Sequence, residues 1–159
     1  MVLTKNRIGF VKSIFIAAEA GLPMQKVIQV SAEESKGLVG DRYAAQLGFW
    51  QTVKQPRKTI RDVSLIRASD IDGSGFSESE TRRNIVIQTD FNLLQLIDKY
   101  FYIGEVLFKG IEECTPCKRP SELSSKSNFA QVFKDKGGLR ALVVTSGLIR
   151  EKDSVIFAD

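Results

Sequence analysis

Histidine is absent from the 159 residues of this sequence. Histidine is the usual general base beside a serine or cysteine nucleophile, and it is a common ligand of zinc and iron. The absence excludes a Ser-His-Asp triad, a Cys-His pair and any histidine-ligated metal site. Chemistry on this chain must therefore use cysteine, carboxylates, lysine, arginine, tyrosine or a bound cofactor.

Long apolar runs are also missing. The most apolar stretch near the N-terminus, residues 14–18, is bounded by Lys12 and Ser13 on one side and by Glu19 on the other. A signal peptide needs an unbroken apolar core of roughly 7–15 residues, and a membrane-spanning helix needs about 20. We therefore expect a cytoplasmic protein that has no membrane partner.

Cysteine is scarce, with only Cys114 and Cys117 present. Two cysteines two residues apart in a chain without a secretion signal indicate thiol chemistry rather than a structural disulfide. One such pair cannot complete a four-thiolate zinc site. A domain of this length buries roughly two-thirds of the surface of its unfolded chain, so it needs no disulfide or metal for stability.

The charge balance is mildly basic, with 23 Lys and Arg against 19 Asp and Glu and a formal net charge of +4. This excess suits an anionic ligand. The basic residues are scattered, apart from short groups at 54–58, 82–83 and 118–119. Proteins that bind nucleic acid usually show a longer basic stripe or aromatic stacking motifs, so we expect no nucleic-acid partner.

Short apolar runs rich in β-branched residues recur along the chain and are separated by glycine, proline, aspartate or asparagine. Many short strands with little helical periodicity predict a mainly β fold, a barrel or a sandwich, in one domain over residues 1–159. The first strand follows a period of two through Ile8, Phe10, Ile14 and Ile16. The other runs lie at 27–30, 63–66, 85–87, 106–108, 141–145 and 155–157.

Two short helices are also predicted. Asp90 could cap one over residues 93–97, whose leucines and isoleucine fall on one face. Ser127 or Asn128 could start another, which Gly137 would end.

The Cys114–Cys117 segment is the first candidate site. A reactive thiol needs nearby cations that favour its thiolate form, and Lys118 and Arg119 directly follow Cys117. We predict that Cys117 is functional, whereas Cys114 could equally be a small buried apolar residue. Disulfide exchange is an alternative, but it would require the pair to open a helix, and Pro120 argues against a long helix at that point.

A turn at Gly40, Asp41 and Arg42 is the second candidate. Gly37 and Gly40 allow a tight turn in which backbone N–H groups approach a ligand closely, and Asp41 and Arg42 add an acceptor and a cation. The run is not a P-loop, because the Gly-Lys-Ser/Thr ending is missing. A plain turn with a solvated salt bridge is the simpler interpretation.

The third candidate comprises Arg82, Arg83 and Asn84, just before the predicted strand at 85–87. Guanidinium groups bind phosphate or carboxylate through two parallel hydrogen bonds. The pair could therefore hold an anionic cofactor, or it could be a solvated strand end.

Taken together, these segments resemble the MOSC family, the domain found at the C-terminus of molybdenum cofactor sulfurases and as small free-standing bacterial proteins. The resemblance implies a MOSC-like β-barrel with a few short helices and a site for the pterin-based molybdenum cofactor. It rests on order and spacing across most of the chain, with matches at 37–42, 63–66, 81–86, 93–94, 101–106, 114–117 and 137–140.

The resemblance also implies roles for individual residues. A cysteine at the position of Cys117 is proposed in the family to ligate molybdenum or to carry sulfur as a persulfide, which makes Cys117 the expected catalytic residue and metal ligand. Tyr43 stands where many relatives have histidine, so no proton-transfer role is carried over to it. The residues expected around molybdopterin are Gly40, Asp41, Arg42, Arg82, Arg83, Asn84 and Lys118.

The function implied by this resemblance is binding of the molybdenum cofactor, with Cys117 as metal ligand or sulfur carrier. A chain that keeps the cofactor would be an oxidoreductase that reduces N-hydroxylated compounds. A non-catalytic module that delivers sulfur or cofactor, and a thiol–disulfide protein that needs both cysteines, stay open as alternatives. Sulfur or electrons would come from a separate cysteine desulfurase or reductase, and pyridoxal phosphate is not expected on this chain.

Overall fold

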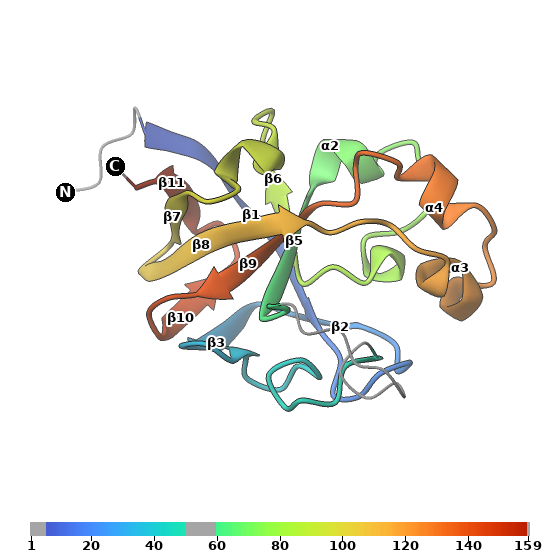
Figure 1. Cartoon of the computed structure of the whole chain (residues 1–159), viewed down its shortest axis with the longest axis horizontal. Coiled ribbons are helices and arrows are strands. Elements are labelled where there is room, and N and C mark those ends of the chain that lie inside the picture. The colour runs from blue at the N-terminus through green and yellow to red at the C-terminus, as the bar shows by residue number, and fades with distance from the viewer. Residues whose placement is uncertain (1–5, 50–59, 159) are drawn as a thin grey trace.

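The structure, a computed structural model, describes residues 6–49 and 60–158 (Figure 1). The basic group at 54–58 lies outside the described residues. The described strands are β1 (Arg7–Ile16), β2 (Gln25–Val27), β3 (Gln29–Glu33), β4 (Gly37–Leu38), β5 (Val63–Arg67), β6 (Ile85–Gln88), β7 (Tyr100–Ile103), β8 (Val106–Glu113), β9 (Leu139–Val143), β10 (Gly147–Arg150) and β11 (Ser154–Phe157). The helical segments are α2 (Ala68–Ile71), η2 (Ser79–Thr81), η3 (Leu93–Leu96), α3 (Arg119–Ser124) and α4 (Phe129–Val132).

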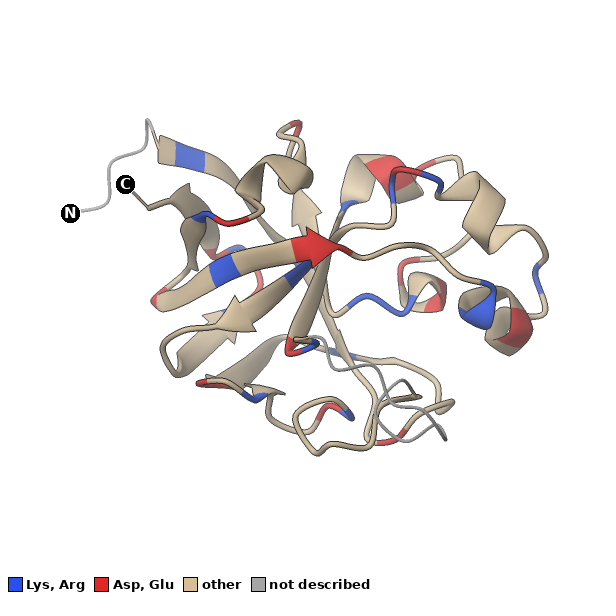
Figure 2. Ribbon diagram, in the orientation of Figure 1, with Lys and Arg blue, Asp and Glu red and all other residues tan. Residues whose placement is uncertain are grey.

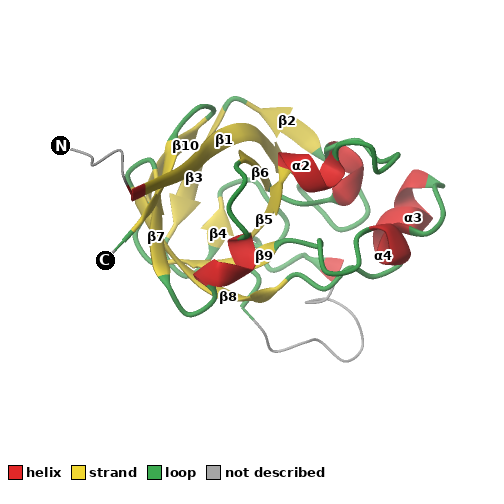
Figure 3. Cartoon of the chain, turned by 90° about the horizontal axis from the view of Figure 1, so that it is seen from above, coloured by secondary structure: helices red, strands yellow, loops and turns green. Residues whose placement is uncertain are grey.

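Seven of the described strands close into a barrel (Figure 3). The order around the barrel is β1-β6-β5-β9-β8-β7-β11, and β11 pairs with β1 to complete it. The β5–β6 pair is parallel, and the other neighbours in the ring are antiparallel. Closure removes the exposed edges that an open sheet would present. The predicted mainly β, MOSC-like barrel is confirmed.

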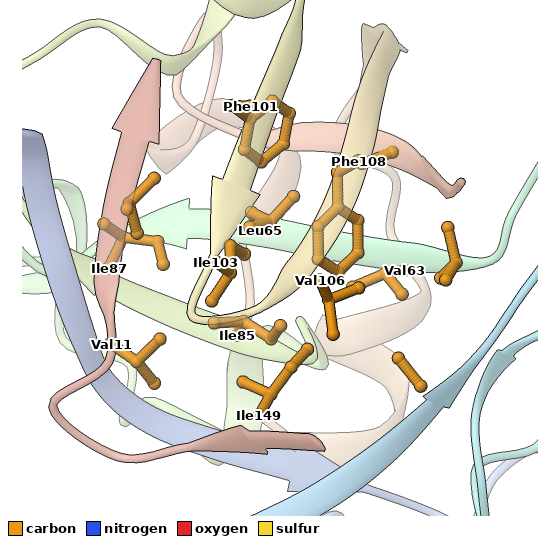
Figure 4. Close-up of a cluster of buried hydrophobic side chains, with 14 of the residues drawn as sticks. Val11, Val63, Leu65, Ile85, Ile87, Phe101, Ile103, Val106, Phe108 and Ile149 are labelled. Carbon is orange, nitrogen blue, oxygen red and sulfur yellow. The ribbon is translucent and has the colours of Figure 1, made fainter. Parts of the chain in front are cut away.

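A second sheet, in the order β10-β3-β4, packs against the barrel core. Its residues Val30, Leu38 and Ile149 belong to the same buried cluster as the side chains of the barrel interior. Figure 4 shows Ile149 beside Val11 and Ile85, which come from barrel strands.

The central strands are buried on both faces. Leu65 of β5 lies in the barrel interior, whereas Ile66 lies in a second cluster with Phe129 and Phe133, under the helices. Successive residues of a strand point to opposite faces, so a strand covered on both sides reads as a continuous apolar run. This explains why the runs at 63–66 and 85–87 are recognisable in the sequence.

The first strand is present as predicted, but the predicted alternation of buried and exposed residues along it is wrong. The β1–β6 register shifts between Val11 and Ser13, which marks a β-bulge. As a result Val11 and Ile14 are both fully buried in the core, while Phe10 is only partly buried. The bulge also accounts for Lys12, which interrupts the apolar pattern.

The predicted helices are present but shorter than expected. Asn92, not Asp90, caps η3, because its side chain accepts a hydrogen bond from the backbone N–H of Leu94. Helix α4 begins directly after Asn128, as predicted, but it ends at Val132, before the glycines. Segments of three to six residues, such as η2 and α3, are too short to show helical periodicity in the sequence. None of the helices among the described residues has the length and apolarity to cross a membrane.

Candidate functional site

A cavity of about 70 Å³ lies beside the excursion that joins β8 to β9 and carries α3 and α4. A space of this size holds several water molecules or a small oxoanion. Figure 2 shows basic residues on two of the segments that enclose it, the start of α3 and the segment before β6. No aspartate, glutamate or lysine of the described residues lines the cavity, whereas six arginines do: Arg42, Arg61, Arg82, Arg83, Arg119 and Arg140.

The structure brings together most of the residues singled out in the sequence. Arg42, Arg82, Arg83, Asn84 and Cys117 all line the cavity. Cys114 lines it as well. Three further arginines that were not predicted as site residues also line the cavity: Arg61, Arg140 and Arg119, the last of which was named only as a cation close to Cys117.

Three predicted site residues do not line the cavity. Gly40 is exposed and has φ +92°, a conformation that favours glycine. Lys118 is exposed and lies away from the cavity lining. Asp41 is fully buried, so its carboxylate is not presented to a ligand in the cavity.

Asp41 stabilises the turn instead. Its Oδ1 accepts hydrogen bonds from the backbone N–H of Ala17 at 3.1 Å and from Nη1 of Arg42 at 3.0 Å. Its Oδ2 accepts one from the backbone N–H of Tyr43 at 3.3 Å. The carboxylate therefore fixes the turn against β1 and orients Arg42 beside the cavity.

Arg83 holds the cysteine segment in place. Its Nε donates to the carbonyl of Gly137 at 2.6 Å, its Nη2 to the carbonyl of Cys114 at 3.3 Å, and its Nη1 to the carbonyl of Thr81 at 3.2 Å. All three bonds are buried. A planar guanidinium suits such simultaneous contacts, so Arg83 clamps the start and the end of the β8–β9 excursion together.

Asn84 joins three strands at the base of the cavity. Its Oδ1 accepts from the backbone N–H and the hydroxyl of Ser64 on β5, at 3.1 and 3.2 Å. Its Nδ2 donates to the carbonyl of Phe15 on β1 at 3.1 Å. Because the side chain is almost completely buried, these bonds fix the position of Asn84 and Ser64 in the cavity wall.

Arg82 differs from its neighbours, because part of its guanidinium is unused. Nη1 donates to the carbonyl of Leu22 at 2.8 Å, but the buried Nη2 has no hydrogen-bond partner within the described part of the chain. Burial, together with the positive charges of Arg42 and Arg119, lowers the pKa of Arg82 to about 10 against the opposing effect of Tyr43 and Asp41. An anion in the cavity would accept a hydrogen bond from Nη2 and would favour the cationic form of Arg82.

Arg119, the first residue of α3, contacts Phe49, which also lines the cavity. Its guanidinium carbon lies 4.3 Å from the centre of the Phe49 ring, a cation–π contact. Among the ion pairs of the described residues, none involves Arg82 or Arg119. By contrast, Arg140 pairs with Glu112 at 2.8 Å.

The two cysteines are free thiols with different surroundings. Cys114 is 6% exposed, and its backbone N–H donates to the carbonyl of Gly138 at 2.8 Å. Cys117 is only partly buried. A helix does follow the pair, since α3 begins two residues after Cys117 with Pro120 in its first turn. Proline is tolerated there because its missing N–H would have no helical partner, and the helix is short, as Pro120 led us to expect.

Comparison with known proteins bears on the fold. No family model matches the sequence, and no curated protein matches it significantly. Solved structures do match. YuaD from Bacillus subtilis has a TM-score of 0.77 at 13% identity, over 92% of this chain and 93% of that one. YiiM from Escherichia coli has a TM-score of 0.64 at 13% identity, over 94% and 69%.

YiiM from Geobacillus stearothermophilus is similar as well, with a TM-score of 0.61 at 11% identity, over 97% of this chain and 74% of that one. YuaD and YiiM are MOSC-domain proteins. At identities this low the likeness concerns the fold. The chain therefore has the fold of the free-standing bacterial MOSC domains.

Proposed function

We propose that this chain binds the molybdenum cofactor at the arginine-lined cavity, which is of a size to take the cofactor's phosphate, with the thiolate of Cys117 as a molybdenum ligand or as the carrier of a sulfur atom. The observation that carries the proposal is the joint position of Cys117 and six arginines around one small cavity. A location in the cytoplasm is part of the proposal.

The chemistry of the side chains fits such a cofactor. Arginine forks bind phosphate oxygens, and a soft thiolate suits a sulfur-rich metal centre. Arg82 and Arg119 would hold the phosphate, since neither has an ion pair among the described residues and Nη2 of Arg82 is buried without a partner.

A bare metal ion fits less well. The described part of the chain contains no group of three or more His, Cys, Asp or Glu residues that could hold a metal ion. A metal at Cys117 would therefore have to arrive with most of its ligands, as the sulfur atoms of a pterin cofactor provide. This favours a cofactor over a free cation.

Each part of the site would then have a separate task. The bound cofactor would supply two-electron redox chemistry. Cys117 would contribute its thiolate, Arg82 and Arg119 would bind the anionic end of the ligand, and Arg83 would keep the cysteine segment in position. If the cofactor stays bound, we propose reduction of N-hydroxylated compounds with a separate reductase; if it is passed on, we propose delivery to a partner, with a cysteine desulfurase as the protein source of sulfur.

The test is the molybdenum content of protein made in a host that produces the cofactor. We expect about one molybdenum per chain in the wild type, and its loss in Cys117→Ser. Cys114→Ser serves as the matched control and should keep the metal. A folded Cys117→Ser variant with full molybdenum content and full reductase activity would refute the role of Cys117.

One observation favours a second candidate, thiol–disulfide exchange. Both cysteines line the same cavity, and α3 begins two residues after Cys117, so the pair does precede a helix as a redox motif requires. This function predicts that Cys114→Ser is as damaging as Cys117→Ser. The cofactor proposal predicts that Cys114 is the more dispensable.

A further inference from the structure

The charge of the cavity is only partly neutralised by the protein. Arg42 is paired with Asp41 at 3.0 Å, and Arg140 with Glu112 at 2.8 Å. Arg83 directs its donors to three backbone carbonyls. These arginines already have partners and serve the architecture.

Arg61 is not free either, so Arg82 and Arg119 are left to receive an anion. The burial of Arg82 and the nearby charge of Arg119 act together to disfavour its cationic form. Two such guanidinium groups beside one cavity of about 70 Å³ suit a small oxoanion. The cavity is therefore suited to a small anion by its positive charge and its volume, whether or not a large cofactor is bound.

The nucleophile beside this anion site has few acid–base groups around it. Cys117 lines the cavity together with Tyr43 and Cys114, which could exchange a proton, but no carboxylate or lysine of the described residues lines it, and the whole sequence contains no histidine. General acid–base catalysis needs such a group within hydrogen-bond reach of the reacting atoms. Arginines outnumber such groups around Cys117, so the site suits a reaction in which a thiolate attacks and an anion leaves, with no proton transferred.

Transfer of sulfane sulfur meets these conditions. We infer that Cys117 takes up sulfur directly from a small anionic sulfane-sulfur donor, of which thiosulfate is the simplest, with Arg82 and Arg119 holding the sulfonate oxygens. This inference rests on the sulfur-carrier form of the proposed function and names its donor class. It replaces a protein donor by a small molecule.

The step balances without a further reactant. The Cys117 thiolate attacks the outer sulfur of thiosulfate and forms a new S–S bond, which makes a persulfide. The S–S bond of thiosulfate breaks, and sulfite leaves with the electron pair of that bond. Thiolate and thiosulfate carry three negative charges together, as do the persulfide anion and sulfite, so no proton, oxidant or reductant is required.

The experiment uses the full chain made in a host that cannot synthesise the molybdenum cofactor, incubated with thiosulfate. Release of sulfite and a mass gain of one sulfur on the peptide that contains Cys117 are measured together. We expect both in the wild type and in Cys114→Ser, and neither in Cys117→Ser. Absence of the persulfide in the folded wild type would overturn the inference.

The role of the arginines is tested by rate. Loss of a hydrogen bond to a charged group costs about 1.5–3 kcal/mol, so Arg82→Gln and Arg119→Gln should each slow sulfite release by at least about tenfold. Arg119→Lys, which keeps the charge, should be slowed less. Arg150→Gln removes the same charge at an exposed position outside the cavity and should react like the wild type.

A measurement without substitutions guards against misfolded variants. Inorganic sulfate should compete with thiosulfate and slow the wild type. If sulfate has no effect and the arginine variants react at the wild-type rate, the anion site is wrong. Molybdenum content separates this inference from the proposed function: persulfide without molybdenum binding leaves only the inference standing, and molybdenum binding without persulfide leaves only the cofactor role.

Discussion

The two walls of the cavity use their polar groups in different ways. The barrel wall, defined by Ser64, Arg83 and Asn84, has its polar side chains in hydrogen bonds with the protein. The open wall, defined by Arg82, Cys117 and Arg119, presents a partly unused guanidinium, a free thiol and a guanidinium held by an aromatic ring.

This difference separates architecture from binding. Removing one partner of a buried hydrogen bond leaves the other unsatisfied, which costs stability. Removing a group that has no protein partner costs little stability but takes away a ligand contact. The barrel wall should therefore be sensitive in unfolding experiments, and the open wall in binding experiments.

The largest effect is expected at Asn84. Asn84→Ala would leave the backbone N–H of Ser64 and the carbonyl of Phe15 buried without their partner. We expect a loss of roughly 2–4 kcal/mol in the free energy of unfolding, measured by urea denaturation. Asn92→Ala, an exposed helix cap, is the matched control and should lose about 1 kcal/mol or less. Equal losses would contradict the distinction between the walls.

A smaller effect is expected at Arg83. Arg83→Lys keeps the charge but cannot reach the carbonyls of Gly137, Cys114 and Thr81 together. We expect a loss of about 1–3 kcal/mol in unfolding free energy, and a fall in molybdenum content despite the conserved charge. Arg150→Lys at an exposed position should change neither. A variant that keeps full stability would show that the clamp is unimportant.

Glu78 supports the segment that leads to Arg82, and its effect depends on pH. Burial alone would raise the pKa of Glu78, but hydrogen bonds from Lys12 and Ser13 outweigh it and bring the pKa below 4.5. The stabilisation is therefore complete above that pH and is lost as pH falls through the lowered pKa.

The corresponding variant is Glu78→Gln. At neutral pH it should lose about 1 kcal/mol of unfolding free energy, and its stability should fall less steeply than that of the wild type below pH 4.5. Glu33→Gln, at an exposed ion pair with Lys36, should match the wild type. Parallel pH profiles for Glu78→Gln and the wild type would contradict this account.

Substitution of Arg82, on the open wall, should affect ligand binding rather than stability. Because its buried Nη2 has no partner within the described residues, and its hydrogen bond to the carbonyl of Leu22 is exposed to solvent, Arg82→Gln should change the unfolding free energy by no more than about 0.5 kcal/mol. A ligand that binds only the folded state stabilises it, so sulfate should raise the melting temperature of the wild type more than that of Arg82→Gln. Chloride at equal ionic strength is the control, and equal shifts in sulfate would argue against an anion site.

The smallest effect is expected at Lys118. This residue follows Cys117 in the sequence, but it is exposed and does not line the cavity. Lys118→Gln should change stability by less than about 0.5 kcal/mol and should leave the molybdenum content unchanged. A marked loss of molybdenum would show that sequence proximity, rather than position on the cavity wall, decides which cations matter.

The strands that the sequence predicted well share a physical feature. Those at 63–66 and 85–87 lie between two buried clusters, so their apolar residues are continuous. Strands such as β4 and β10 have two and four residues and carry little pattern. The bulge in β1 was not predicted, because it depends on pairing with β6 rather than on the residues of β1 alone.

The residues of the candidate site also fall into those that could be predicted from the sequence and those that could not. Cys117 and the neighbouring pair Arg82 and Arg83 were singled out from their residue types and from the family resemblance. The different surroundings of Arg82 and Arg83 were not predicted, because two adjacent residues of the same type cannot be told apart in the sequence. Arg61 carried no signal, and Arg140 only lay in a segment that matched the family, since their position at the cavity depends on strands that pair far apart in the chain.

The sequence by itself determined which chemistry is available: two thiols, no histidine, many arginines and enough short apolar runs for a closed β fold. These follow from composition and local pattern. Only the tertiary structure decided that Asp41 and Arg83 form hydrogen bonds that hold the turn and the cysteine segment, whereas Arg82 and Arg119 line the cavity without an ion pair among the described residues. The reason is that a charged group's role depends on its burial and its partners, and both are set by contacts between segments distant in the chain.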